Sequence, residues 1–466
     1  MITPVHYIST LITIIIVSFL GFSSSKKVES SEDFAVGSRK LGTTKIAGSI
    51  IATIVGGAST IGTAQLAFQQ GINAMWFTLG SSIACLFLGL FLAIPLRKAE
   101  VDTVSQFLSR SYGEYAGVAA SIITSFAIFI HITGQFISSI AILSSLFNMA
   151  VALAAIITVA MIISYIFFGG FLGTSIVGIM KTILLYLTLG ISGILTLKFF
   201  GGTQGFVAAF PKEPWLNLFS NGVSAGLAQG FSMVVGVAST QTYLQAMFAG
   251  KTGKESRKGA FLSALLIPPI GFVCTLIGMY MRTVNPNLVP REALPAFILN
   301  YLNPWVGGIT IAALIISVIG TGAGLTLGVS TMVNRDIYLR FINPKADDKT
   351  QLKVLRLSVF GVSALALLML FTNADSLILK WGFLSMALRG TTVFIPLLAA
   401  IFFKDRVSEK AGLIAIIVAP ISTILWEIFG MSNIDSLYIG ILASILMLVI
   451  FSLNPVGVHR EAEEHK

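Results

Sequence analysis

The chain has 466 residues, of which 55% are hydrophobic and only 11% are charged. A soluble domain carries roughly 25% charged residues, so this chain cannot hide its apolar side chains in a core of its own and needs the lipid bilayer as a solvent. The two cysteines, Cys85 and Cys274, fall inside apolar segments, which excludes a disulfide framework.

The hydropathy pattern predicts an all-α, multi-pass membrane protein of the cell (inner) membrane, with about 13 spanning helices. The first apolar segment has no basic stretch before it and is followed by Lys26 and Lys27, so we expect it to remain in the membrane rather than to be cleaved. The predicted spans cover residues 4–23, 45–70, 73–96, 115–145, 147–167, 173–199, 218–246, 259–281, 303–333, 355–372, 376–402, 409–429 and 434–452.

The basic residues predict the orientation of these spans. With the N-terminus outside and the C-terminus cytoplasmic, most of the 30 Lys and Arg residues fall in cytoplasmic loops, and the outer loops hold only Lys198, Lys212, Arg282 and Arg291. The net charge of +10 therefore reflects topology, and we expect no nucleic-acid partner. We find neither a GxxxxGK[ST] motif nor a catalytic constellation in the loops, so we expect neither ATP-driven transport by this chain alone nor an enzyme.

One short motif occurs twice. Residues 55–60 read VGGAST, and residues 235–240 read VGVAST, in each case inside a long apolar segment. A chance match in a Gly-, Ala- and Ser-rich chain is the alternative. Paired, glycine-interrupted helices at corresponding places in two halves of a chain indicate a transport site, because the unwound backbone lines a cavity there.

Several further motifs, taken in order and spacing, resemble the sodium/solute symporter family over nearly the whole chain. They are SEDFAVGSR at 31–39, VSQFL at 104–108 with YG at 112–113, the Gln241-to-Gln245 stretch with AGK at 249–251, EALPA at 292–296, and ST at 330–331 with RDIY at 335–338.

The resemblance implies a LeuT-type 5+5 inverted repeat. Residues 1–44 would form an extra N-terminal helix and a cytoplasmic loop, residues 45–200 the first repeat, and residues 201–402 the second repeat. Residues 403–466 would form two peripheral helices and a short cytoplasmic tail. The first and sixth core helices unwind in this fold, and the two copies of the repeated motif fall in those helices.

The resemblance also implies a sodium site with incomplete ligands. Its backbone carbonyls align with Ala52 and Val55, and its partners on the eighth core helix align with Ser317, Gly320 and Thr321. Thr321 keeps a hydroxyl, but Gly320 has none. Sodium prefers several hard oxygen ligands, so we expect weakened binding at a degenerate site.

A second departure concerns the fifth core helix. Where the family often has an acidic residue and a glutamine, this chain has Gly178 and Lys181. An ionisable residue at bilayer depth is functional by default. We therefore expect Lys181 to replace the cation and to give proton coupling or uncoupled exchange. The alternative is a lysine that extends to the cytoplasmic interface.

The predicted substrate contacts lie around the breaks and on two further helices. Arg389, in the tenth core helix, would bind a carboxylate, or else would only bond helix-end carbonyls. His131 and Gln135 are one turn apart and either line the cavity or pack between helices. The residues at the breaks are Gly56, Gly57, Ser59, Thr60, Ser239, Thr240 and Gln241, although Ser and Thr also join helices to each other.

Together these features predict a secondary active transporter that imports a small polar organic solute by alternating access, and this solute is anionic if Arg389 binds a carboxylate. Sodium coupling would be weakened or absent, and a proton would act through Lys181. The alternatives are a conventional sodium-coupled symporter and a transport-derived solute sensor. We expect no cofactor beyond a sodium ion or a proton in its place, a small-molecule solute and the lipid bilayer as partners, and a functional monomer.

Overall fold

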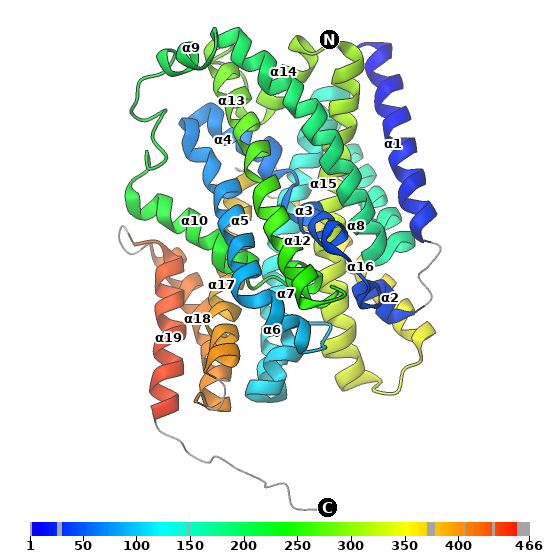
Figure 1. Cartoon of the computed structure of the whole chain (residues 1–466), viewed down its shortest axis with the longest axis vertical. Helices are drawn as coiled ribbons and strands as arrows, with labels where there is room; N and C mark the ends of the chain where they lie inside the picture. The colour runs from blue at the N-terminus through cyan, green and yellow to red at the C-terminus, as the bar shows by residue number, and fades with distance from the viewer. Residues whose placement is uncertain are drawn as a thin grey trace, which may run out of the picture.

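The computed structural model describes residues 2–25, 30–147, 149–370, 378–403, 406–430 and 434–453, and these residues are almost entirely helical (Figure 1). The tail predicted after residue 453 lies outside them. The elements up to the second predicted repeat are α1 (Pro4–Ser25), α2 (Ser31–Val36), η1 (Gly37–Arg39), α3 (Thr43–Ile54), η2 (Ala58–Gly62), α4 (Thr63–Gln70), η3 (Gly71–Met75), α5 (Trp76–Phe87), η4 (Leu88–Leu92), α6 (Ala93–Lys98), α7 (Val104–Phe147), α8 (Val151–Phe200) and α9 (Thr203–Ala208).

The later elements continue the same all-helical pattern. They are α10 (Val223–Val237), α11 (Gln241–Phe248), α12 (Gly253–Leu266), α13 (Pro268–Val284), η5 (Pro290–Glu292), α14 (Ala293–Tyr301), α15 (Pro304–Met332), η6 (Val333–Ile342), α16 (Asp348–Leu370), α17 (Ile378–Phe402), α18 (Glu409–Phe429) and α19 (Ser436–Leu453).

Both copies of the repeated motif interrupt a helix, as the sequence predicted. In the first copy, α3 ends before Val55, whose backbone is extended (φ −84°, ψ 91°), and a π-helical turn resumes at Ala58. In the second copy, α10 ends at Val237 and α11 begins at Gln241, with a bend of 47° between them. Each break leaves main-chain groups that side chains must satisfy inside the protein.

The long helix α8 is not straight. A Cβ atom added to Gly320 of α15 would lie 3.9 Å from both the Tyr165 hydroxyl oxygen and Lys181 Nζ. Sixteen residues of straight α-helix rise about 24 Å, which is too far for both side chains to reach one point. The helix therefore bends between these residues.

Eight described helices are long and apolar enough to cross a membrane, and the bent pair α10–α11 makes a ninth. Four shorter apolar helices lie at Pro4–Leu20, Thr43–Ile54, Val151–Ile163 and Ser436–Ser452. The number of thirteen spans therefore stays a prediction. Large apolar side chains are exposed along α1, α16 and α19, among them Phe19, Phe360 and Leu442. Such surfaces suit lipid and not water.

We name the two ends of the bundle the α4 end and the α2 end. The α4 end is where α4 finishes; Gln70 there accepts a hydrogen bond from Asn221 just before α10, and Tyr438 of α19 bonds Ser224. The α2 end is where Ser31 of α2 bonds Asp348 of α16. Helix α4 lies at the upper left and α2 at the lower right of the bundle (Figure 1).

Candidate functional site

The ammonium of Lys181 occupies the point on which the predicted sodium ligands converge. Its Nζ donates to the carbonyl of Ala52 at 2.6 Å and to the carbonyl of Val55 at 2.5 Å. It also lies 3.4 Å from the Ser317 carbonyl and 3.5 Å from the Thr321 hydroxyl. All four contacts are with neutral oxygens, three carbonyls and one hydroxyl.

The hydroxyls on α15 bind the same two carbonyls. Ser317 Oγ donates to the Val55 carbonyl at 2.7 Å, and Thr321 Oγ1 donates to the Ala52 carbonyl at 3.0 Å. The side chain of Lys181 is fully buried. The alternative of a lysine that reaches the interface is therefore wrong for this structure. The carbonyls of Ala52 and Val55, which the first break leaves without helical partners, accept hydrogen bonds from these side chains.

Close packing of glycines positions the lysine. A Cβ on Gly178 would lie 2.1 Å from the carbonyl oxygen of Gly48 and 2.6 Å from Cβ of Ala52. Helices α8 and α3 therefore touch through their backbones, which places Lys181, three residues further on, beside the break. An acidic side chain at position 178, as the family resemblance implies, would not fit this contact.

Gly320 leaves space beside the lysine. A Cβ at this position would meet nothing closer than 3.9 Å, and its nearest neighbours would be Lys181 Nζ and Tyr165 Oη. The Tyr165 hydroxyl is buried and has no hydrogen-bond partner among the described residues. The sequence reasoning missed Tyr165, because only the bend in α8 brings its hydroxyl close to Gly320.

The first break is closed by its own polar residues. Gly56 N donates to Ser59 Oγ at 2.9 Å, and Thr60 Oγ1 donates to the Gly56 carbonyl at 2.7 Å. Gly57 N donates to Gln135 Oε1 at 3.0 Å. A Cβ on Gly57 would lie 2.0 Å from Ser138 Oγ, so glycine is required for α7 to approach this closely.

At the second break, two of the three predicted polar residues are committed to protein contacts. Thr240 Oγ1 donates to the Gly236 carbonyl at 2.6 Å. Gln241 reaches the loop before α7, where it accepts from Val104 N at 2.9 Å and donates to the Asp102 carbonyl at 2.8 Å. Ser239 Oγ is buried and unpaired among the described residues.

Arg389 of α17 is fully buried and joins three elements. Its Nη1 donates to Thr240 Oγ1 at 2.8 Å, and its Nη2 contacts His131 Nδ1 of α7 at 3.1 Å. A guanidinium can only donate, so Nδ1 of His131 accepts and the imidazole carries its hydrogen on Nε2. Ser385 supplies two more acceptors, at 3.0 Å and 2.9 Å. Each of these acceptors is neutral, and no carboxylate among the described residues pairs with the guanidinium.

The structure thus separates the predicted substrate contacts into two groups. Ser59, Thr60, Thr240 and Gln241 use their side chains to hold the breaks and the loop before α7. In contrast, Gln135 Nε2 and Ser239 Oγ are buried without partners among the described residues. Buried polar groups are normally hydrogen-bonded, so these two atoms mark positions where a bound solute could complete the hydrogen bonding.

Comparison with known proteins identifies the family. The model of the sodium:solute symporter family matches residues 34–419. The chain belongs to this family. It is 22% identical to a high-affinity proline transporter of Bacillus subtilis (93% of this chain, 95% of the relative), and 25% identical to the human high affinity choline transporter 1 (86% and 72%).

Solved structures agree with this assignment. A substrate-bound, outward-open Na⁺-coupled sialic acid symporter matches with a TM-score of 0.81 at 16% identity, over 97% of both chains. A nucleobase-cation-symport-1 family transporter matches with a TM-score of 0.61 at 12% identity, over 89% of this chain and 93% of that chain. The chain therefore has the all-α LeuT-type fold. As a member of its family, it is a multi-pass membrane transporter of a small-molecule solute, not an enzyme. Sodium is the coupling ion that the family implies.

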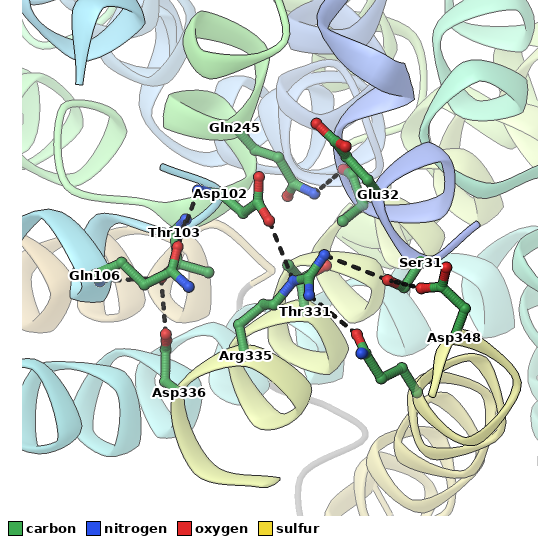
Figure 2. A network of polar contacts seen from close by, with 12 residues as sticks. Ser31, Glu32, Asp102, Thr103, Gln106, Gln245, Thr331, Arg335, Asp336 and Asp348 are labelled. Atoms are coloured by element: carbon green, nitrogen blue, oxygen red, sulfur yellow. Dashed lines mark hydrogen bonds and ion pairs between the residues drawn. The ribbon is translucent and has the colours of Figure 1, made fainter. Parts of the chain in front are cut away.

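In this family member, a network of charged side chains ties the α2 end together (Figure 2). Asp102 binds Arg39 Nη2 at 2.8 Å and Arg335 Nε at 3.1 Å. Arg335 also donates to Gln351 at 3.0 Å, and Thr103 donates to Asp336 at 2.8 Å. The network joins the entry to α3, the loop before α7, and η6. Through Gln241, which bonds the same loop, it also holds α11.

Proposed function

We propose that this symporter-family protein is a secondary transporter that carries a small polar, carboxylate-bearing solute inward by alternating access, with the Lys181 ammonium in place of sodium. The observation that carries the proposal is the pair of short contacts from Lys181 Nζ to the carbonyls of Ala52 and Val55. These carbonyls belong to the first break, so the charge state of one side chain acts directly on a helix that must move during transport.

Electrostatics supports competition between the lysine and sodium. Two unit positive charges about 4 Å apart repel by about 4 kcal/mol at an effective dielectric constant of about 20. A sodium ion within reach of the Ala52 carbonyl would meet this repulsion while Lys181 is charged. Sodium would bind only after the lysine lost its proton or withdrew. Without this proton, Lys181 would bind the carbonyls of Ala52 and Val55 more weakly. Protonation of Lys181 would therefore affect the conformation of the first break.

The buried guanidinium supports a carboxylate as part of the solute. Arg389 is held against Thr240 at the second break, and in the part of the chain that the structure describes no carboxylate pairs with it. Gln135 Nε2 can donate and Ser239 Oγ can donate or accept, so both can bind a carboxylate or a polar group of the solute. A bound anion would lower the electrostatic cost of keeping Arg389 inside the membrane.

Topology and assembly enter the same proposal. Arg39, Arg97 and Arg335 lie at the α2 end, which we therefore place in the cytoplasm, with the α4 end outside. We also infer that residues 45–200 and 201–402 are the two inverted repeats, since each contains one broken helix. The functional monomer predicted from the sequence is also part of this proposal.

A conventional sodium-coupled symporter is the second candidate, because Ser317 and Thr321 retain hydroxyls at the cation site. Proteoliposomes that contain the purified protein distinguish the two. Uptake of labelled L-proline, succinate and acetate is measured under an imposed sodium gradient or an imposed pH gradient. We expect saturable uptake that follows the pH gradient and ignores sodium. Strong sodium stimulation without pH dependence would contradict the role of Lys181 and favour the second candidate.

A further inference from the structure

A cavity of about 280 Å³ opens at the α4 end, away from the Lys181 site. Its walls come from α4, α10, α17, α18 and the start of α19, and its floor includes Ala387, two residues before Arg389. Ligand cavities begin at roughly 300 Å³, so this one suits a small solute. Ala387 and Arg389 leave α17 about 200° apart, so this cavity is separate from the buried guanidinium.

Charges of opposite sign line this cavity without pairing. Lys380 contributes an ammonium, and Glu427 and Asp435 contribute carboxylates. Among the described residues, no ion pair within 4.0 Å joins Lys380 to either acid. Surface charges at a membrane interface are usually just solvated, but here three elements direct unpaired charges toward one cavity.

The acidic side of the cavity favours a positive group. Burial raises the pKa of Asp435, and the negative charge of Glu427 raises it further. One oxygen of Asp435 accepts from Leu437 N at 3.0 Å, which caps α19. The side-chain oxygen of Gln229, which lines the same cavity, is buried and accepts no hydrogen bond from the described residues. An ammonium group would satisfy this oxygen and reduce the repulsion between the two acids.

We propose that this cavity is a first binding site for a zwitterionic solute of the amino-acid type. Lys380 binds its carboxylate, and Glu427, Asp435 and Gln229 bind its ammonium group. The inference rests on the proposed function and narrows its substrate class from carboxylate-bearing solutes to amino acids.

Thermal unfolding of the full-length protein tests the substrate class. Each of the twenty standard amino acids is added separately, and acetate and succinate are added as plain carboxylates. We expect at least one amino acid to raise the unfolding temperature. Its decarboxylated amine and its deaminated acid, each lacking one of the two charges, should give little or no shift. If only plain carboxylates stabilise the protein, the inference is wrong while the proposed carboxylate transport stands.

Variants test the location. Lys380→Gln, Glu427→Gln and Asp435→Asn remove one charge each, and the asparagine can still cap α19. We expect each to weaken binding of the stabilising amino acid by about fivefold, the effect of one partly exposed ion pair. Lys353→Gln and Glu409→Gln, at the opposite end of the bundle, are the matched controls. Equal affinity in all five variants overturns the assignment of this cavity, even if uptake follows the pH gradient.

Discussion

Gly178 of α8 and Gly48 of α3 are in backbone contact, since a Cβ on Gly178 would lie 2.1 Å from the Gly48 carbonyl oxygen. This contact sets the distance between the two helices and brings Lys181 to the first break. The space that relatives would need for an acidic side chain is used here for helix packing. The acidic side chain that the family resemblance implies at position 178 would have no space in this contact.

The glycine contact predicts the effect of a single methyl group. Gly178→Ala should destabilise the protein by about 1–3 kcal/mol, because the new Cβ meets a main-chain oxygen that cannot move freely. Gly190→Ala, on the same helix, meets nothing within 4 Å and should be neutral or stabilising by up to about 1 kcal/mol. Thermal unfolding in detergent measures both. An equal effect of the two substitutions would contradict the close approach of α8 to α3.

The cation site should accept sodium once the lysine is removed and the missing hydroxyl is supplied. In Lys181→Gln with Gly320→Ser, the new serine has room beside the Ala52 carbonyl. We expect sodium, compared with potassium at equal ionic strength, to raise the unfolding temperature of this double variant but not that of the parent protein. Lys198→Gln with Gly320→Ser is the control, because Lys198 is exposed on α8. Sodium stabilisation of the parent would show that Lys181 does not exclude the ion.

Arg389 should matter more for transport than for folding. Arg389→Gln removes the uncompensated charge but keeps a side chain that can bond Thr240 or Ser385. We expect solute uptake to fall by at least about tenfold, the equivalent of one charge-assisted hydrogen bond lost at the solute. The unfolding temperature should change little, because removal of a buried charge offsets the lost hydrogen bonds. Normal uptake by a folded Arg389→Gln variant would show that the guanidinium does not bind the substrate.

The ion pairs of Asp102 should hold the α2 end closed. Asp102→Asn leaves Arg39 and Arg335 without their shared carboxylate, which is only 12% exposed. A partly buried charged hydrogen bond contributes about 1.5–3 kcal/mol, so we expect opening of this end to increase by about tenfold or more.

Thiol labelling at Ser105→Cys, a buried position just inside α7, reports on this opening. The background is low because Cys85 and Cys274 are buried. Glu114→Gln is the control, since Glu114 is 73% exposed and lies 4.0 Å from Arg340. Unchanged labelling in Asp102→Asn would mean that the network does not limit opening of the α2 end.

The sequence alone determined the class of the molecule and the place of its two breaks. Hydrophobic segments and glycine-rich interruptions are local properties of the chain, and Val55–Thr60 and Val235–Thr240 interrupt their helices as predicted. The family motifs also led to Ala52, Val55, Ser317 and Thr321, which do converge in space. These residues could be found because alignment to a known pattern needs no distances.

Only the tertiary structure decided what each polar side chain contacts. Lys181 was predicted either to replace the cation or to reach the interface, and the backbone contact of Gly178 with Gly48 places it at the carbonyls. Tyr165 reaches the site because α8 bends between Tyr165 and Lys181. Gln135 and Ser239 keep unpaired polar atoms, whereas Thr240 and Gln241 do not. Hydrogen-bond partners come from residues that are tens to hundreds of positions apart, so their pairing depends on packing and cannot be read from local sequence.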